Sequence, residues 1–447
     1  MSMFLRRPTR QIVLGDERVG IVRVGGGLPT ERHHDASMES PPEEGGPAPV
    51  SVQTMTAGYT HDVAACVGEI NRLAAAGADV VRVAVPEKKD TAALKEIIPQ
   101  VNVPIVADVH FHFKRALEAV EAGVHKIRLN PGNISDRDQV NEVIDACKEA
   151  GLPIRVGVNE GSIIERKDKQ KRKEELGKFF AKNAIGGKHA HLLGLIIAKL
   201  EEYMDIFYER DFRDVAISCK SMDAAFTVTA YKEVASRFDH PLHLGVTHAG
   251  PKETGCIRSI AALSGLLTQG IGDTVRISYA NDPVYEVEDG LELMYSLGLR
   301  ERKGAELIAC PTCGRIQVDL FTLVQDVRET LEEAITVPMK VAVMGCVVNG
   351  PGEAEGADVA VFAGNQRGII YVQGERIANV PETDILVRLR EECVAFQKRV
   401  LDGEVVLGEK KVEIVPPDPI GELGSGAEKI ARGDVETVPT ALTVGGS

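Results

Sequence analysis

The chain has 447 residues, of which 44% are hydrophobic and 26% charged, and this composition is ordinary for a soluble protein with real hydrophobic cores. The length predicts two or three domains. The formal net charge of −14 argues against nucleic acid as the main partner, because nucleic-acid binding depends on neutralising phosphates.

Nothing in the sequence predicts membrane attachment or export. The longest apolar stretch, residues 192–198, is far shorter than the ~18 residues that a membrane span needs. The N-terminal arginines are not followed by the apolar segment of a signal peptide. Eight cysteines do not make a disulfide scaffold in a chain of this length. We therefore expect a cytoplasmic protein whose C-x-x-C motif is metal-binding or catalytic.

The first 50 residues are predicted to hold a small strand pair and a flexible insertion. Residues 10–23 resemble two strands that turn at Gly15 and Asp16 and close the bottom of the domain that follows. Residues 29–49 are rich in proline, glycine and glutamate. Such a segment cannot bury much apolar surface, so we expect it to be disordered.

Residues 50–280 alternate short β-branched runs with helical patterns. A helix is expected over residues 62–76, with Asp62 as its N-cap and Gly77 as its stop. Strands that alternate with helices form parallel βαβ units, and eight such units over this length predict a closed (β/α)8 TIM-type barrel. The eight expected strands begin near Val50, Val80, Pro104, Lys126, Pro153, Val215, Leu242 and Thr274.

An open, doubly wound sheet is the alternative fold for this pattern. That fold predicts a glycine-rich phosphate loop after the first strand, and residues 54–59 are not glycine-rich, so the barrel is favoured. The fifth connection, residues 161–213, is long and begins with a basic run at residues 166–173. We expect it to contain an extended or extra helix.

Polar residues are expected at or after the carboxyl ends of the barrel strands, where barrel active sites lie. Five of them are fixed cations, and converging cations repel one another unless an anion lies between them. Because guanidinium groups match phosphate oxygens, the pattern predicts a small substrate with about two phosphates. The alternative is that several of these cations pair with buried carboxylates such as Asp108. The predicted set comprises Arg82, Asp108, His110, Arg128, Asn130, Arg155, Asn159, Lys220, His248, Arg276 and Ser278.

The pattern changes near residue 300 and predicts a small α+β domain. Strands are expected over residues 305–310, 340–346, 358–363 and 369–377, and helices over residues 319–334 and 382–401. We therefore divide the chain into a barrel domain at residues 1–300, an α+β domain at residues 301–406 and a mobile tail at residues 407–447.

Three cysteines in the α+β domain predict a metal cluster. Cys310 and Cys313 lie in C-P-T-C-G, and Cys346 lies in M-G-C-V-V-N-G-P-G-E, which ends at Glu353. Iron–sulfur clusters are held by thiolates, and a site with three of them leaves one metal corner to a weaker ligand or a substrate.

Two other interpretations stay open at this point. The same cysteines could hold structural zinc, with Cys393 or a histidine as fourth ligand, in a non-redox barrel enzyme with a phosphate substrate; a second zinc knuckle is missing, however. The chain could also be a non-enzymatic iron–sulfur sensor or scaffold, which would leave the barrel cations without a role. The cysteines at positions 66, 147, 219 and 256 are more typical of core packing.

The motifs together resemble the 4-hydroxy-3-methylbut-2-en-1-yl diphosphate synthase family of the non-mevalonate isoprenoid pathway. The resemblance runs through nearly the whole chain. The motifs that carry it are S-V-Q-T-M-T, D-V-H-F, I-R-L-N-P-G-N, R-V-G-V-N-E-G-S, L-H-L-G-V-T, G-I-G-D-T-V-R-I-S, C-P-T-C-G-R and V-A-V-M-G-C-V-V-N-G-P-G-E.

The resemblance implies a specific reaction and cofactor. A [4Fe–4S] cluster would bind Cys310, Cys313 and Cys346, with Glu353 as a fourth, weaker ligand that a substrate oxygen can displace. The substrate 2-C-methyl-D-erythritol 2,4-cyclodiphosphate would be reductively opened and dehydroxylated to 4-hydroxy-3-methylbut-2-enyl diphosphate. Two electrons would come from reduced flavodoxin or ferredoxin, and the enzyme would be a head-to-tail homodimer. The residues expected to bind the diphosphate are Arg82, His110, Arg128, Asn130, Arg155, Asn159, Lys220, Arg276 and Ser278.

One position departs from the family pattern. The family usually has T-E-A-G where this chain has T-H-A-G, so His248 replaces a glutamate that is thought to act as acid or base. Histidine transfers protons near neutral pH, and we expect His248 to take the proton-donor role. The alternative is that His248 only hydrogen-bonds the substrate, while Glu253 or water supplies the proton.

Overall fold

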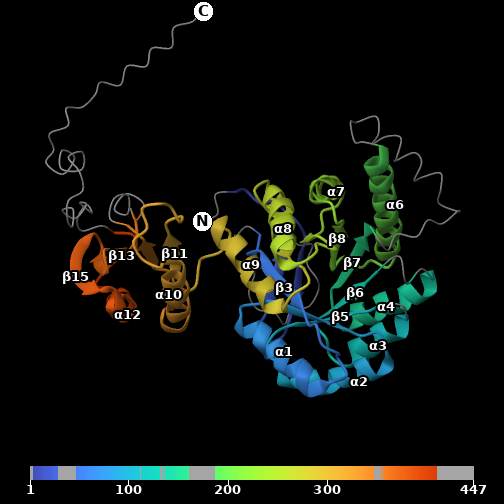
Figure 1. Cartoon of the computed structure of the whole chain (residues 1–447). Coiled ribbons are helices and arrows are strands. Elements are labelled where there is room, and N and C mark those ends of the chain that lie inside the picture. Colours follow the sequence, from blue (N-terminus) through green and yellow to red (C-terminus); the bar gives the residue numbers. More distant parts are fainter. Residues whose placement is uncertain are drawn as a thin grey trace, which may run out of the picture. The chain divides into compact units, whose positions relative to one another are not determined.

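The chain forms two compact units, residues Met1–Arg300 and Glu301–Ser447, each of which is described by itself (Figure 1). The computed structural model describes residues 4–28, 47–110, 112–130, 134, 136–160, 187–346, 354 and 356–409. Within these ranges, no helix has the length and apolar character that crossing a membrane requires.

A closed parallel barrel forms the first unit, as the sequence predicted. The sheet order is β8-β7-β6-β5-β4-β3-β10-β9, and all neighbours in it are parallel. A parallel bridge between Ile217 and Leu242 joins β8 to the residue before β9 and so closes the ring. This closure excludes the open, doubly wound sheet. The strands are β3 (Ser51–Met55), β4 (Val80–Ala84), β5 (Ile105–Asp108), β6 (Lys126–Leu129), β7 (Ile154–Asn159), β8 (Val215–Lys220), β9 (His243–Leu244) and β10 (Thr274–Val275).

Helices alternate with these strands and cover the outside of the barrel (Figure 1). The Asp62 side chain accepts a hydrogen bond from the Ala65 amide at the start of α1, and Gly77 follows its end with a φ of +102°, so both predicted signals are confirmed. Outward-facing strand residues such as Val81 and Ile127 pack in one core with helix residues such as Leu73. The helices are α1 (Val63–Ala75), α2 (Lys88–Ile97), η1 (Ile98–Gln100), α3 (Phe113–Glu121), α4 (Arg137–Glu149), α6 (Gly187–Glu209), α7 (Ala224–Arg237), α8 (Lys252–Leu267) and α9 (Pro283–Ser296).

A two-stranded hairpin closes the end of the barrel where the strands begin. Strands β1 (Gln11–Leu14) and β2 (Val22–Gly25) pair antiparallel, as predicted. Ile12, Leu14 and Val24 pack against three residues near the starts of barrel strands, Val80, Val106 and Ala216. The barrel is therefore accessible from the carboxyl ends of its strands.

The long fifth connection contains the expected extra helix, because α6 occupies residues 187–209 between β7 and β8. The basic run at residues 166–173 lies outside the described residues. The same is true of most of the predicted disordered segment, namely residues 29–46, and of residues 410–447 in the predicted tail.

The second unit is a five-stranded mixed sheet with two main helices. Its order is β11-β12-β13-β14-β15, with β11, β12 and β13 parallel and the last two strands antiparallel. Asp319 caps α10 by accepting a hydrogen bond from the Thr322 amide. The elements are β11 (Glu306–Ala309), α10 (Leu320–Ala334), β12 (Lys340–Met344), β13 (Val359–Gly364), β14 (Arg367–Val372), β15 (Glu375–Pro381), η4 (Glu382–Asp384) and α12 (Ile385–Leu401).

One predicted strand of this unit is wrong. Residues 369–377 were expected to form a single strand, but the chain turns between Val372 and Glu375, and the two halves pair as β14 and β15. Gln373 and Gly374 both have positive φ, at 50° and 84°, which is the conformation of a two-residue type I′ turn. Gln-Gly is not one of the common dipeptides of that turn. The sequence analysis therefore did not recognise the turn and predicted one continuous strand across it.

Candidate functional site

The interior of the barrel is unusually rich in charge. Arg82, Arg128, Arg155 and Lys220 point into it from β4, β6, β7 and β8, and each is at most 9% exposed. Barrel interiors are normally filled by bulky branched apolar side chains. Burying charges in this number has a large desolvation cost unless partners compensate it.

Asp108 neutralises part of this charge. Its carboxylate accepts a hydrogen bond of 2.9 Å from Arg128 Nη1 and lies 3.5 Å from Arg82 Nε and 3.4 Å from His110 Nε2. Burial alone would raise the pKa of Asp108, but the two guanidinium groups and His110 hold that pKa well below its usual range. The alternative that Asp108 pairs with barrel cations is thus confirmed for Arg82 and Arg128.

A second buried carboxylate, Glu286 in the first turn of α9, was missed by the sequence analysis. It is 3% exposed, and its Oε2 lies 3.2 Å from Arg276 Nη2. The same oxygen accepts from Thr54 Oγ1 at 3.1 Å. A glutamate in the first turn of a helix is normally an exposed dipole partner, so its sequence position gave no signal of burial.

Cations remain in excess after these pairs are formed. Within the described part of the chain, Arg155 and Lys220 form no salt bridge, and Arg155 Nε and Nη1 have no hydrogen-bond partner. Burial, with neighbouring cations adding to it, lowers the pKa of both Arg155 and Lys220 well below their ordinary values. The site therefore has spare donors and positive charge for an anion.

Lys126 adds a further cation that the sequence analysis did not select. It is the first residue of β6 and is 1% exposed. Burial lowers the pKa of Lys126 to about 7, and Arg155 and Arg82 contribute to the shift. Its spacing of two residues from Arg128 puts both on the inner face of β6, and that spacing was the available signal.

Gly157 lets polar side chains pack close to the backbone of β7. A Cβ at this position in β7 would lie 3.3 Å from Ser218 Oγ, 3.4 Å from Arg128 Nε and 3.4 Å from Arg155 Nη2. Ser218 Oγ and Arg128 Nε have no hydrogen-bond partner among the described residues. These polar atoms can approach the strand closely because glycine has no side chain, and they keep hydrogen-bonding capacity for an anion in the barrel.

The remaining predicted residues lie near the carboxyl ends of the strands. Asn130 is buried, Asn159 and Ser278 are half-buried, and His248 is exposed after β9 with a φ of +52°. Arg155 is a correction to the prediction, because it is the second residue of β7 and lies deeper than the strand end.

The cysteines of the second unit lie at the ends of neighbouring parallel strands. Cys310 follows β11, and Cys346 follows β12 after one intervening residue. The Gly345 amide donates a hydrogen bond of 3.3 Å to Cys310 Sγ, and Cys313 is exposed in the turn that follows. Backbone amides that donate to sulfur are a feature of iron–sulfur sites. Glu353 lies outside the described residues.

Comparison with known proteins identifies the family. The family model described as the GcpE TIM-barrel domain matches residues 42–291, and that described as the GcpE protein C-terminal domain matches residues 306–395. The chain belongs to the GcpE family.

Curated relatives of this GcpE chain match most of its length. A Streptomyces avermitilis protein named 4-hydroxy-3-methylbut-2-en-1-yl diphosphate synthase (flavodoxin) 2 is 44% identical over 83% of this chain and 91% of the relative. A Corynebacterium glutamicum protein named 4-hydroxy-3-methylbut-2-en-1-yl diphosphate synthase (flavodoxin) is 42% identical over 90% of this chain and 95% of the relative. Among solved structures, an N-acetylneuraminic acid synthetase from Leptospira borgpetersenii is 10% identical, with a TM-score of 0.39, over 65% of this chain and 90% of that one.

The thiols of the GcpE chain suit an iron–sulfur cluster in residue type and placement, although the described residues contain no group of three His, Cys, Asp or Glu side chains already arranged around one metal position. The same cysteines are less suited to a zinc site in which Cys393 is the fourth ligand. Cys393 is fully buried in the core of the second unit, beside Leu389 and Phe396, and burial raises the pKa of its thiol to about 12.

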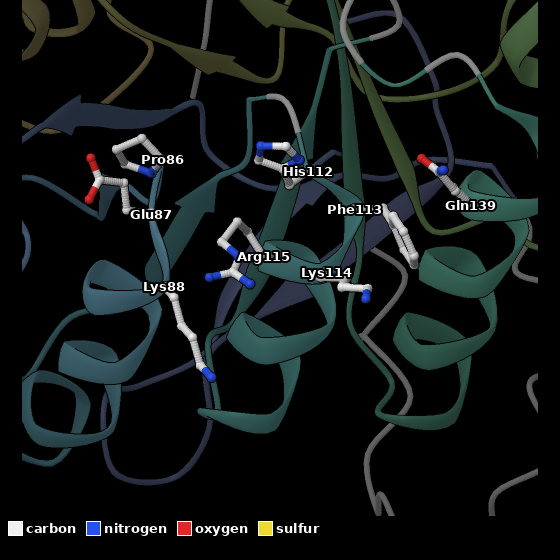
Figure 2. Close-up of a pocket in the computed structure, with 8 residues that line it drawn as sticks. All are labelled: Pro86, Glu87, Lys88, His112, Phe113, Lys114, Arg115 and Gln139. Carbon is white, nitrogen blue, oxygen red and sulfur yellow. The ribbon is translucent and has the colours of Figure 1, made fainter.

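A separate pocket of about 540 Å³ lies beside the barrel, where α2 and α3 begin (Figure 2). Figure 2 shows Lys88 and Arg115 on neighbouring helices, with Phe113 and Lys114 nearer to Gln139. Arg115 is paired with Glu118 at 2.7 Å. The pocket contains none of the predicted site residues, so it is distinct from the cationic barrel interior.

Proposed function

We propose that this chain is a 4-hydroxy-3-methylbut-2-en-1-yl diphosphate synthase. It would reductively open and dehydroxylate 2-C-methyl-D-erythritol 2,4-cyclodiphosphate to 4-hydroxy-3-methylbut-2-enyl diphosphate. The names of relatives that are 42–44% identical over most of the chain support this activity. The observation that carries the proposal is the surplus of buried cations inside the barrel, above all Arg155, whose Nε and Nη1 have no partner among the described residues.

The diphosphate would bind at the carboxyl end of the barrel. Fixed guanidinium and ammonium groups would hold its oxygens, while side chains at the strand ends would orient the carbon skeleton. Asp108 and Glu286 would keep the arginines in place before the substrate arrives. The proposed binding residues are Arg82, His110, Arg128, Asn130, Arg155, Asn159, Lys220, Arg276 and Ser278.

A [4Fe–4S] cluster would bind to Cys310, Cys313 and Cys346, with Glu353 as the fourth ligand. When bound, the cluster supplies single electrons and a Lewis-acidic iron. The fit rests on the adjacent strand ends that present Cys310 and Cys346 and on the amide that donates to Cys310 Sγ.

Reduced flavodoxin is the proposed electron donor, because the relatives' names specify it, with ferredoxin as the alternative. We further propose a head-to-tail homodimer. All eight cysteines are free thiols, which suits the reducing cytoplasm.

His248 is the proposed acid–base residue at the mouth of the barrel. It lies in the loop between β9 and α8 and is exposed. Its ring Nδ1 lies 3.4 Å from Thr247 Oγ1. Left-handed backbone at a residue other than glycine often marks a functional position, and here it supports a selected orientation of the imidazole.

An anaerobic assay tests the function directly. Holoenzyme is mixed with the cyclodiphosphate and dithionite, and the product is identified by mass spectrometry. Cys346→Ser should lose the cluster's visible absorbance and turnover together. Cys256→Ser, a half-buried cysteine of α8, is the matched control and should keep both. Zinc in place of iron by metal analysis, or full turnover of Cys346→Ser, would refute the proposal.

A further inference from the structure

A carboxylate outside the predicted site lies at the mouth of the barrel. Glu160 directly follows Asn159, the last residue of β7, and is half-buried. Ser221 directly follows Lys220, the last residue of β8, and Asn159 and Lys220 are opposite each other in the sheet. Glu160 therefore lies next to two proposed substrate-binding residues.

Ser221 fixes the orientation of this carboxylate. Its hydroxyl donates a hydrogen bond of 2.5 Å to Glu160 Oε2. Ser221 Oγ itself accepts a hydrogen bond of 3.1 Å from the Asp223 amide, so the hydroxyl proton is left to point at Glu160. Ser221 is 1% exposed, and this bond is of the short kind that hydroxyls form with carboxylates.

Glu160 differs from the other carboxylates of the barrel interior. Asp108 and Glu286 are held in ion pairs with arginines, and their charge is needed there. No described arginine or lysine forms an ion pair with Glu160, and its hydrogen-bond partner is the neutral hydroxyl of Ser221. Proton transfer to or from Glu160 would therefore break no ion pair with a described arginine or lysine.

A series of contacts places Glu160 and His248 in the same part of the rim. The carbonyl of Ser221 accepts a hydrogen bond of 3.1 Å from the Thr247 amide. Thr247 Oγ1 in turn lies 3.4 Å from His248 Nδ1. Glu160 is half-buried and His248 is exposed, so the two groups lie at different depths in the same sector of the mouth.

We propose that Glu160, rather than His248 directly, delivers a proton to the departing hydroxyl group of the substrate, and that His248 exchanges this proton with solvent. This inference rests on the proposed function. The carbon–oxygen bond breaks with its electron pair on oxygen, and the carboxylic acid supplies the proton, so the group leaves as water. The two electrons come from the reduced electron donor, and a solvent proton returns to Glu160 through His248.

Other charged groups on the neighbouring elements bear on the pH dependence of this step. They are Arg155 on β7, Lys220 on β8, Asp223 before α7, and His189 on α6, which lies 3.8 Å from Asp223. Because these groups are unchanged in the variants below, comparison between variants isolates Glu160 and His248.

The test compares Glu160→Gln and Glu160→Asp with wild type. Single-turnover rates are measured with reduced holoenzyme, and substrate Kd is measured with oxidised holoenzyme, which does not turn over. Glu160→Gln should slow the single turnover about 100-fold, the usual contribution of a positioned acid, with Kd unchanged. Glu160→Asp should recover part of the rate. Glu149→Gln, an exposed residue at the far end of α4, is the matched control and should behave as wild type.

Exogenous acids separate the two roles. Imidazole in the buffer should rescue His248→Gln, whose defect lies at the exposed rim, and should not rescue Glu160→Gln. Ser221→Ala should lower the rate several-fold and shift its pH profile, and Ser221→Thr should restore both. A Glu160→Gln enzyme that turns over at the wild-type rate, or whose entire defect lies in Kd, would overturn the inference alone. Wild-type enzyme without turnover would overturn the proposed function as well.

Discussion

Lys126 couples the stability of the barrel to pH. Its pKa is about 7 in the folded chain against an ordinary 10.5, so the unfolded chain binds more protons between these values. The free energy of unfolding should therefore rise with pH across this interval, by at most about 1.4 kcal/mol per pH unit for this one group.

Lys126→Met should remove this dependence. The variant should be more stable than wild type near pH 7. The difference should shrink towards pH 10, because the folded amine is already neutral there and the unfolded amine begins to lose its proton as the pH approaches 10.5. Urea denaturation between pH 6 and pH 10 measures the two curves. Parallel curves would contradict the assignment.

Asp108 has the opposite role, since its charge is required. Asp108→Asn leaves Arg82 and Arg128 buried without their carboxylate and should cost about 3 kcal/mol of the free energy of unfolding at pH 7. Because the folded pKa of Asp108 is depressed, its contribution is present above the unfolded value of roughly 3.9 and is lost as the pH falls through the folded value. Denaturant melts at pH 7 and pH 3 should show the difference between variant and wild type shrinking at the lower pH.

Some residues of this site could be predicted from the sequence, and others could not. Arg82 and Arg128 lie within recognisable strands, so their inward position followed from the alternation of side chains. Glu286 lies on a helix, where one turn alone does not distinguish a buried from an exposed face. Glu160 follows a strand end, and its importance depends on Ser221, which is 61 residues further along the chain.

At the scale of elements, β7 shows how a strand shapes the binding space. Gly157 has an ordinary strand conformation, so Gly157→Ala should fold, but its methyl group would lie 3.3–3.4 Å from Ser218 Oγ, Arg128 Nε and Arg155 Nη2. The Kd of inorganic diphosphate should rise about tenfold, as one added methyl group in a tight site does.

Isothermal titration of holoenzyme with diphosphate measures this change. Gly68→Ala is the control, because a Cβ at that exposed position of α1 meets nothing within 4 Å. An unchanged Kd in Gly157→Ala would show that the placement of these three polar atoms does not affect anion binding.

The elements themselves were largely predictable because hydrophobic periodicity fixes them. All eight barrel strands and α1 with its caps follow the pattern that the sequence predicts. The β14–β15 hairpin did not, because Gln373 adopts a positive φ that its residue type rarely takes. The turn is imposed by the pairing of the two flanking strands. A pattern of hydrophobic residues along the sequence does not reveal this pairing.

At the scale of the whole molecule, the chain has two compact units with separate chemistry. The cationic interior belongs to residues Met1–Arg300 and the three cysteines to residues Glu301–Ser447. Loss of the proposed cluster should therefore leave the binding of a simple anion to the barrel intact.

Cys346→Ser tests this independence. The variant should bind inorganic diphosphate with the wild-type Kd although it has lost its visible absorbance. Arg155→Met should show the reverse, with weakened diphosphate binding and intact absorbance. A Cys346→Ser protein that no longer binds diphosphate would mean that the two units are coupled in the absence of substrate.

The β1–β2 hairpin has a consequence for how substrate enters the barrel and product leaves it. It seals one end of the cylinder with Ile12, Leu14 and Val24. Substrate must enter and product must leave through the same opening. A bound product molecule therefore prevents the next substrate molecule from binding until it dissociates. The product should accordingly act as a competitive inhibitor towards the substrate, because it cannot dissociate through the opposite end of the barrel.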